Sequence, residues 1–401
     1  MTNEKLKVHA NNIRKNIITE VYSAKSGHPG GSLSAADILT ELYFEQMDIN
    51  KENVNTIDRD RFVLSKGHAS PLLYATLAEK GFIDMEDLKG FRHIDSKLQG
   101  HPNMNYVAGV DMSTGSLGQG ISCSVGMAIT NKADGNNHRI YALLGDGECE
   151  EGQVWEAAMA ASNKVVYASS FAMFAAGRAF EQIRNSICYP NLNVKVCATH
   201  AGISVGEDGA SHQCIEDLAL MRSIPNMKVF QPCDAKQTEE IIKAVYSIEG
   251  PCYVRLGRLG VEDVYDENYK YEFGKGNVLK KGSKVAIIAS GLMVQESLKA
   301  YNLLENKPTI IDIPTIKPID KELIIETAKT HDVIVTVEEH NVYGGLGSAV
   351  SEVLAPEGIA CRQYMLGMQD TFGRSGKPKD LLDYYGLDAQ HVAEEIKKIN
   401  K

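Results

Sequence analysis

A glycine-flanked aspartate follows a short apolar run in the first half of the chain. Residues 140–144 are apolar, and after them come Gly145-Asp146-Gly147-Glu148 and a helical pattern that begins near Gly152. Glycines let the backbone approach a ligand closely, and a carboxylate is a hard oxygen ligand that suits Mg²⁺ carrying a diphosphate. Taken alone, the turn is a weak signal and is better explained as an ordinary strand-to-helix connection capped by an aspartate.

Three histidines lie in similar glycine-containing turns upstream of this aspartate. They are His28 in Ser26-Gly27-His28-Pro29-Gly30-Gly31-Ser32, His68 in Ser65-Lys66-Gly67-His68-Ala69-Ser70, and His101 in Gly100-His101-Pro102. A rigid turn that presents an imidazole suits hydrogen bonding to hydroxyls and phosphates, or proton transfer near neutral pH. One such histidine is more often structural or merely exposed. Three of them, followed by Ser113-Thr114-Gly115-Ser116-Leu117-Gly118-Gln119-Gly120 and the Asp146 turn, indicate a binding site.

These turns need a scaffold of short apolar strands that alternate with helical patterns. In the first part of the chain, residues 62–64 and 140–144 are predicted strands, and apolar residues in 33–47 recur at helical spacing. This alternation predicts an α/β fold with mainly parallel sheets. Further strands are predicted at 165–168, 194–198, 252–256, 285–289, 309–313, 333–337 and 361–366, before an amphipathic helix at 389–399.

The bulk composition excludes several classes of function. The chain has 401 residues, 43% of them hydrophobic and 23% charged, which is typical of a globular protein with two or three cores. A net charge of −10 argues against a nucleic-acid or anionic-membrane partner. The eight cysteines form no Cys-x-x-Cys pair, and the N-terminal residues are polar where a signal peptide is apolar. The sequence therefore predicts a cytoplasmic protein that acts on small molecules, without a nucleic-acid or membrane partner.

The order of the motifs resembles the transketolase family, whose members use thiamine diphosphate and Mg²⁺. The three histidine turns, the Ser113–Gly120 stretch and Gly145-Asp146-Gly147-Glu148-Cys149-Glu150-Glu151-Gly152-Gln153-Val154-Trp155 resemble its diphosphate-binding domain. Segments 169–174 and 199–213 resemble its pyrimidine-binding domain, and segments 337–341 and 344–347 its C-terminal domain. The resemblance implies a truncated diphosphate-binding (PP) domain at 1–163, a truncated pyrimidine-binding domain at 164–260 that is possibly merged with the first, a linker at 261–282 and a C-terminal domain at 283–401.

The resemblance also implies roles for individual residues. His68, Gly115 and Gly147 would contact the diphosphate, Asp146 would bind Mg²⁺, with Ca²⁺ or Mn²⁺ as possible substitutes, and Leu117 would support the bent cofactor. Phe174, with Phe171 nearby, would stack on the aminopyrimidine ring. His28, His101, His200 and His212 would be the catalytic histidines that contact the sugar, with Asp208 at its C2 hydroxyl and Arg258 at its phosphate. From the residues alone, the better explanation of Phe171 and Phe174 is as helix-core residues, and that of Arg258 is as an exposed loop charge.

Transketolases transfer a two-carbon ketol unit between sugar phosphates, and their site lies between two subunits, so the resemblance implies a homodimer. Offset stacking of an aromatic ring against the aminopyrimidine would add to simple burial. For the phosphate, the planar fork of Arg258 is suited to bidentate hydrogen bonding.

The sequence departs from the family in its middle. After the helix expected at 152–162, the chain runs directly into 165–171, which already resembles the middle of the pyrimidine-binding domain. The missing stretch would carry a second Mg²⁺ ligand and the family's Gly-Ile-Ala-Glu-Gln segment, whose glutamate hydrogen-bonds the aminopyrimidine. We therefore expect weak cofactor binding and low ketol transfer. We also expect strand 165–168 to pair with strand 140–144, which would merge the two domains.

Two other interpretations remain open. The absent glutamate and second metal ligand favour a non-catalytic homologue that acts as a scaffold or binding protein. Deoxyxylulose-phosphate synthase shares the cofactor, but the Ser65–Ser70 turn and the Glu148–Glu156 stretch resemble transketolase instead.

Overall fold

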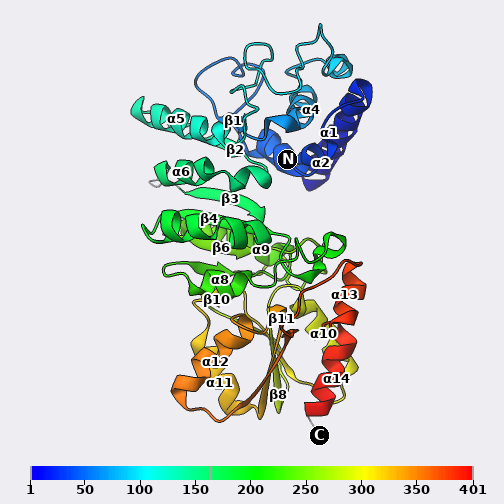
Figure 1. The fold of residues 1–401 in the computed structure, drawn as a ribbon, viewed down its shortest axis with the longest axis vertical. Coiled ribbons are helices and arrows are strands. Elements are labelled where there is room, and N and C mark those ends of the chain that lie inside the picture. The colour runs from blue at the N-terminus through cyan, green and yellow to red at the C-terminus, as the bar shows by residue number, and fades with distance from the viewer. Residues whose placement is uncertain (1, 162–164, 400–401) are drawn as a thin grey trace. The chain divides into compact units, whose positions relative to one another are not determined.

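The computed structural model describes residues 2–161 and 165–399, which form two compact units (Figure 1). Unit 1 comprises residues 1–160 and unit 2 residues 161–401. Each is α/β, as the sequence predicts. Throughout the described part of the chain, no helix combines the length and the hydropathy that crossing a membrane requires.

Unit 1 is a layer of helices around a short parallel sheet. β1 (Arg61–Leu64) pairs with β2 (Ile140–Leu143) in register from Arg61 with Ile140 to Leu64 with Leu143. Both strands were predicted, and the helical pattern at 33–47 is divided among three short helices. The helical elements are α1 (Asn3–Ala24), α2 (Pro29–Leu33), α3 (Ala36–Glu41), η1 (Leu42–Gln46), η2 (Gly67–Ala69), α4 (Ser70–Lys80), η3 (Met85–Gly90), α5 (Gln119–Ala133), η4 (Gly147–Glu150) and α6 (Gly152–Ala160).

The core of unit 1 lies around α4. All residues of this helix from Ser70 to Ala78 are buried, and Leu72 and Leu77 pack with Ile13 and Ile17 of α1. Pro71 is well tolerated in the first turn, because a residue there donates no intrahelical hydrogen bond. This buried helix therefore anchors the chain just after His68, which lies two residues before its first residue, Ser70.

The first sheet of unit 2 has the strand order β10-β5-β6-β4-β3. β3 (Val166–Phe171), β4 (Val194–Thr199), β6 (Cys252–Arg255) and β5 (Lys228–Phe230) are parallel, whereas β10 (Thr315–Lys317) is antiparallel to β5. The connections contain η5 (Phe174–Arg178), α7 (Phe180–Gln182), η6 (Ile183–Cys188), η7 (Ile203–Asp208), α8 (Asp217–Ser223) and α9 (Ala235–Ser247).

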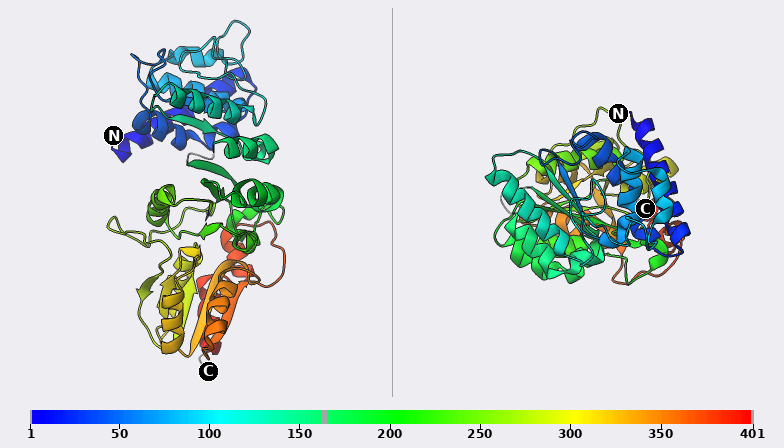
Figure 2. Two further views of the ribbon diagram at one scale, coloured as in Figure 1. Left: turned by 90° about the vertical axis from the view of Figure 1, so that its left-hand side faces the viewer. Right: turned by 90° about the horizontal axis from the view of Figure 1, so that it is seen from above.

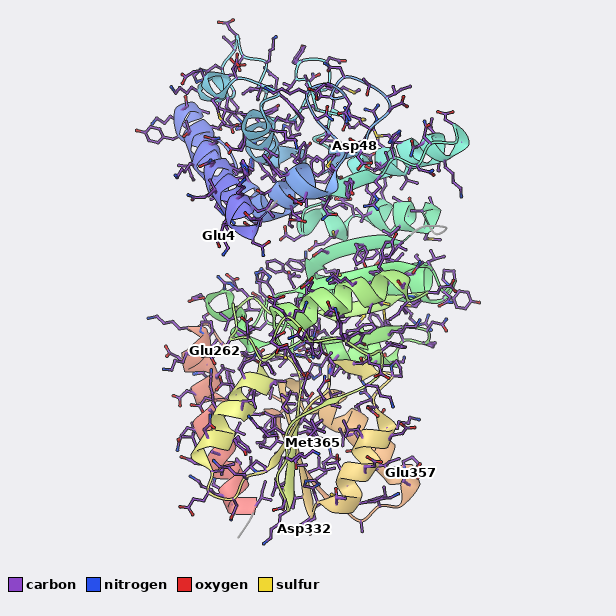
Figure 3. All side chains as sticks on the ribbon, turned by 180° about the vertical axis from the view of Figure 1, so that it is seen from behind. Glu4, Asp48, Glu262, Asp332, Glu357 and Met365 are labelled. Carbon is purple, nitrogen blue, oxygen red and sulfur yellow. The ribbon has the colours of Figure 1, made fainter. Side chains whose placement is uncertain are left out.

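The second sheet of unit 2 has the order β12-β11-β8-β9-β7. Figures 1 and 2 show its strands between two helical layers, with α10 and α14 on one side and α11 and α12 on the other. Met365 of β12, labelled in Figure 3, lies so close to Gly347 that a side-chain carbon added to this glycine would be 2.8 Å from its Cγ. The elements are β7 (Asn277–Lys280), β8 (Val285–Ala289), α10 (Met293–Leu303), β9 (Thr309–Asp312), α11 (Lys321–Thr330), β11 (Val333–Asn341), α12 (Leu346–Glu357), β12 (Arg362–Met368), α13 (Pro378–Tyr384) and α14 (Ala389–Ile399).

The expected pairing between strands 165–168 and 140–144 would join the two units, and it stays a prediction. Over its whole length β3 pairs with β4, from Val166 with Val194 to Phe171 with Thr199, and the ladder partner of β2 is β1. The segment between β3 and β4 forms the helical crossover that two parallel strands need, so β3 joins the strand that follows it in the chain. The expected linker at 261–282 also contains a strand, β7, which forms an antiparallel edge with β9.

Asp312, at the end of β9, makes the stability of unit 2 depend on pH. The side chain is fully buried, which raises its pKa to about 6, although hydrogen bonds from Tyr265 (2.7 Å) and Gln237 (2.6 Å) oppose this rise. Because the folded-state pKa exceeds the unfolded value, the stability contributed by protonated Asp312 is complete at acidic pH and is lost as pH rises through 6.

Asp312→Asn should remove this loss. Relative to the wild type, we expect the variant to gain about 2–3 kcal/mol between pH 4 and pH 8, measured by urea unfolding at each pH. Asp266→Asn, at an exposed loop position, is the matched control. The same pH dependence in Asp312→Asn as in the wild type would contradict the assignment.

Candidate functional site

In unit 1, the histidine turns predicted from the sequence lie together. The ring centroids of His28 and His68 are 5.1 Å apart in an edge-to-face arrangement. A side-chain carbon added to Gly115 would lie 3.3 Å from Cδ2 of His101, and one added to Gly31 would lie 3.6 Å from Nε2 of His68. The structure thus brings His28, His68, His101 and Gly115 into one cluster.

A buried lysine joins this cluster to the aspartate turn. Lys66 donates from Nζ to the carbonyl of Gly31 at 3.0 Å. Burial lowers the pKa of Lys66, while the nearby charges of Asp146 and Glu148 raise it. Asp146 is therefore close enough to Lys66, in the His68 turn, to interact with its charge. A metal ligand would need such a position if these turns held a diphosphate.

The imidazoles of His68 and His101 favour the neutral form. Burial lowers the pKa of His68, and His28, Lys66 and His101 lower it further, while Glu148 opposes them. Burial also lowers the pKa of His101, together with Arg92 and His28. At neutral pH both rings are therefore uncharged, and each can donate one hydrogen bond and accept another.

The backbone of these turns fits a phosphorylated ligand. A side-chain carbon on Gly67 would lie 2.8 Å from the amide nitrogen of Gly115, so the two turns pack backbone to backbone. One added to Gly147 would meet no described atom within 4 Å, so the turn is open on that side. Leu117, two residues after Gly115, is 38% exposed. Closely packed backbone, neutral imidazoles and a lysine form a donor set that suits diphosphate oxygens.

Among the residues described, one group of three His, Asp or Glu side chains has ligand atoms mutually within 4.8 Å, namely Asp383, Asp388 and His391 of unit 2. Asp146 is not a member of such a group in residues 2–161 and 165–399. A Mg²⁺ ion at Asp146 would thus take most of its oxygens from the diphosphate and from water.

In unit 2, the predicted aromatic and histidine residues also assemble. Phe171, the last residue of β3, stacks on His200 with centroids 3.9 Å apart, and on Phe174 at 5.5 Å. His212 meets Phe174 edge-on at 5.7 Å. Phe171 and Phe174 are half-buried at a strand-to-helix turn. They are therefore not the helix-core residues that their spacing also allowed.

The proposed sugar-binding loop lies next to this aromatic cluster in the sequence. Arg258 donates to the carbonyl of Val205 and lies 3.7 Å from Asp208. Gly202 has a φ of 84°, and a side-chain carbon there would overlap the carboxylate of Glu339, so only glycine fits. Arg258 is partly exposed but anchored to the loop, and it is therefore not simply a free loop charge.

Sequence reasoning missed Glu148 as a site residue. Its side chain is 1% exposed; Oε1 accepts from the amide of Gly118 at 2.8 Å and from the hydroxyl of Ser65, and Oε2 accepts from the amide of Gly145 at 2.9 Å. The signal in the sequence was a carboxylate two residues after Asp146. Inside a turn, however, the simpler expectation is that such a side chain is exposed to solvent.

Comparison with known proteins identifies the family. Family models match the thiamine diphosphate binding domain of transketolase at residues 5–167, its pyrimidine binding domain at 153–262 and its C-terminal domain at 274–392. A putative transketolase C-terminal section from Methanocaldococcus jannaschii is 48% identical over 256 residues, which cover 62% of this chain and 80% of that protein. The chain belongs to the transketolase family.

Solved structures and longer relatives agree with this assignment. A split gene transketolase, described as an inactive beta4 tetramer, is 47% identical with a TM-score of 0.58, over 65% of this chain and 83% of that one. A transketolase from Pichia stipitis in complex with sedoheptulose-7-phosphate is 18% identical with a TM-score of 0.50, over 98% and 97%, and supports the fold alone.

Comparison with longer relatives also shows that this chain lacks a stretch that they contain. Human transketolase is 26% identical over 609 aligned positions, which cover 98% of this chain and 97% of that protein. Because this chain has 401 residues, at least 208 of the 609 positions have no counterpart in it. The transketolase models for the first two domains overlap at 153–167, which is where the sequence predicted the missing stretch.

Proposed function

We propose that this transketolase-family chain binds thiamine diphosphate with Mg²⁺ and transfers a two-carbon ketol unit between sugar phosphates at a rate reduced by its missing segment. The assembly of His28, His68, His101 and Gly115 in unit 1 carries the proposal. These turns retain a donor set for a diphosphate although the chain is shorter than its relatives.

In this proposal the chain's residues bind, orient and move protons. His68, Gly115 and Gly147 hold the diphosphate, Asp146 the metal and Leu117 the bent cofactor, while Phe171 and Phe174 offer aromatic surface to its pyrimidine ring. His28, His101, His200 and His212 exchange protons with sugar hydroxyls, Asp208 binds the C2 hydroxyl and Arg258 the phosphate. The bound cofactor supplies the electron sink for cleavage of the carbon–carbon bond.

The second candidate is a non-catalytic binding or scaffold protein. The absence of a Gly-Ile-Ala-Glu-Gln segment from all 401 residues favours it. Proton transfer by one positioned side chain contributes about 10²- to 10⁴-fold to a rate. Losing the glutamate alone would therefore make turnover hard to detect even where the cofactor binds.

We also propose a homodimer, because the family's site is built between subunits. The expected result is twice the chain mass by light scattering coupled to size exclusion.

Calorimetric titration with thiamine diphosphate and Mg²⁺ tests the proposed function, followed by a ketol-transfer assay with xylulose and ribose phosphates. We expect measurable binding that His68→Ala weakens at least about tenfold, with slow transfer. His331→Ala, in unit 2, is the matched control. A folded protein that binds no cofactor would defeat the enzyme assignment, whereas binding without transfer would favour the second candidate.

A further inference from the structure

We propose that Glu148 is a positioning residue that holds the three diphosphate-binding turns of unit 1 in one arrangement. Its three donors belong to three different turns. Ser65 begins the His68 turn, Gly118 follows Gly115, and Gly145 precedes Asp146. The inference rests on the proposed function for its consequence, but the contacts themselves do not depend on a cofactor.

The topology explains why hydrogen bonds between these turns are needed. The His68 turn follows β1 and the Asp146 turn follows β2, so both emerge at the carboxyl ends of neighbouring parallel strands. These two strands are four residues each and form a sheet of their own. So short a ladder fixes the strands better than the turns beyond them, and Glu148 joins these turns through side-chain and backbone hydrogen bonds.

The chemistry of the contacts makes Glu148 hard to replace. A buried carboxylate is tolerated only when hydrogen bonds satisfy its oxygens, and each of its oxygens accepts at least one. Gly118 has a φ of 80°, the left-handed conformation, and a side-chain carbon on Gly120 would lie 2.6 Å from Oγ of Ser65. The glycines thus let these turns approach the carboxylate, which at 1% exposure acts through them and touches no ligand itself.

Substitutions at Glu148 separate this role from general stability. Glu148→Ala removes all three bonds. Glu148→Gln keeps one acceptor oxygen, so the amide of either Gly118 or Gly145 faces an NH₂ group instead of an acceptor. Asp111→Asn is the matched control, because Asp111 is another buried carboxylate of unit 1, held by Arg59 and the amide of Phe62.

The first measurement is hydrogen exchange without cofactor, resolved to Gly118 and Gly145. We expect Glu148→Ala to exchange at least about tenfold faster at both glycines and Glu148→Gln at one of them, with Asp111→Asn unchanged at both. Unequal effects on the two glycines in Glu148→Gln cannot arise from a uniform loss of stability, so this variant decides the matter even where Glu148→Ala fails to fold. Unchanged protection of both glycines in a folded Glu148 variant would overturn the proposal.

The second measurement is the dissociation constant for thiamine diphosphate with Mg²⁺. Loss of a residue that orients ligands typically costs 10- to 100-fold in affinity, and we expect Glu148→Ala to fall in about that range, with Asp111→Asn within about threefold of the wild type. Faster exchange with unchanged cofactor affinity would overturn the positioning role. A wild type that binds no cofactor would refute the proposed function, while hydrogen exchange would still decide whether Glu148 holds the turns.

Discussion

Asp217→Ala should destabilise unit 2 by about 3–5 kcal/mol, because it leaves a buried guanidinium without its carboxylate. Asp217, the first residue of α8, is fully buried and accepts from Nε of Arg255 at 2.8 and 3.0 Å, and from the hydroxyl of Tyr253 at 2.8 Å. Arg255 is 2% exposed, and within residues 2–161 and 165–399 its further hydrogen-bond acceptors are the backbone carbonyls of Cys214 and Glu339. Urea unfolding followed by circular dichroism gives the free energy of unfolding.

Two further variants test whether the unpaired charge of Arg255 causes the loss of stability. Asp217→Ala combined with Arg255→Met removes both charges and should cost less than Asp217→Ala alone. Tyr253→Phe removes one hydrogen bond and should cost about 1–2 kcal/mol. A double variant as unstable as Asp217→Ala would contradict the charge argument.

The sequence revealed β8 through an unbroken apolar run. The whole of β8, Val285–Ala289, is buried, and its run of Val, Ala and Ile was recognisable because both faces of a parallel strand are covered. β5 and β10 were missed because three residues such as Lys228-Val229-Phe230 give no period. The partner of β10 lies in the preceding sheet of unit 2, a contact that no local pattern encodes.

The candidate site was predictable where motifs determine it and unpredictable where contacts across the fold determine it. The pairing of Phe171 with Thr199 places His200 beside Phe171, so parallel strand ends explain that stack once the register is known. Glu148 was missed because its partners Ser65 and Gly118 lie 83 and 30 residues away.

Restoring the missing segment should have the largest effect on activity. Insertion of the corresponding stretch of a transketolase that carries Gly-Ile-Ala-Glu-Gln, between residues 161 and 165, should raise ketol transfer by about 10²- to 10⁴-fold. If the proposed function is correct, the glutamate of that segment supplies proton transfer to the aminopyrimidine. The 401 residues contain no Gly-Ile-Ala-Glu-Gln segment, whereas His28, His68 and His101 are already assembled. The measurement is the steady-state rate with xylulose and ribose phosphates.

The control separates the glutamate from the added scaffold. The same insertion with that glutamate changed to glutamine supplies the missing strands and the second metal ligand but not the proton-transfer group. If the proposed function is correct, this control should bind thiamine diphosphate more tightly than the shortened chain and still transfer ketol units slowly. Equal, raised rates for the two insertions would contradict the role of the glutamate. Such a result would mean that weak binding of the metal and cofactor limits the shortened chain, and that the inserted segment restores this binding.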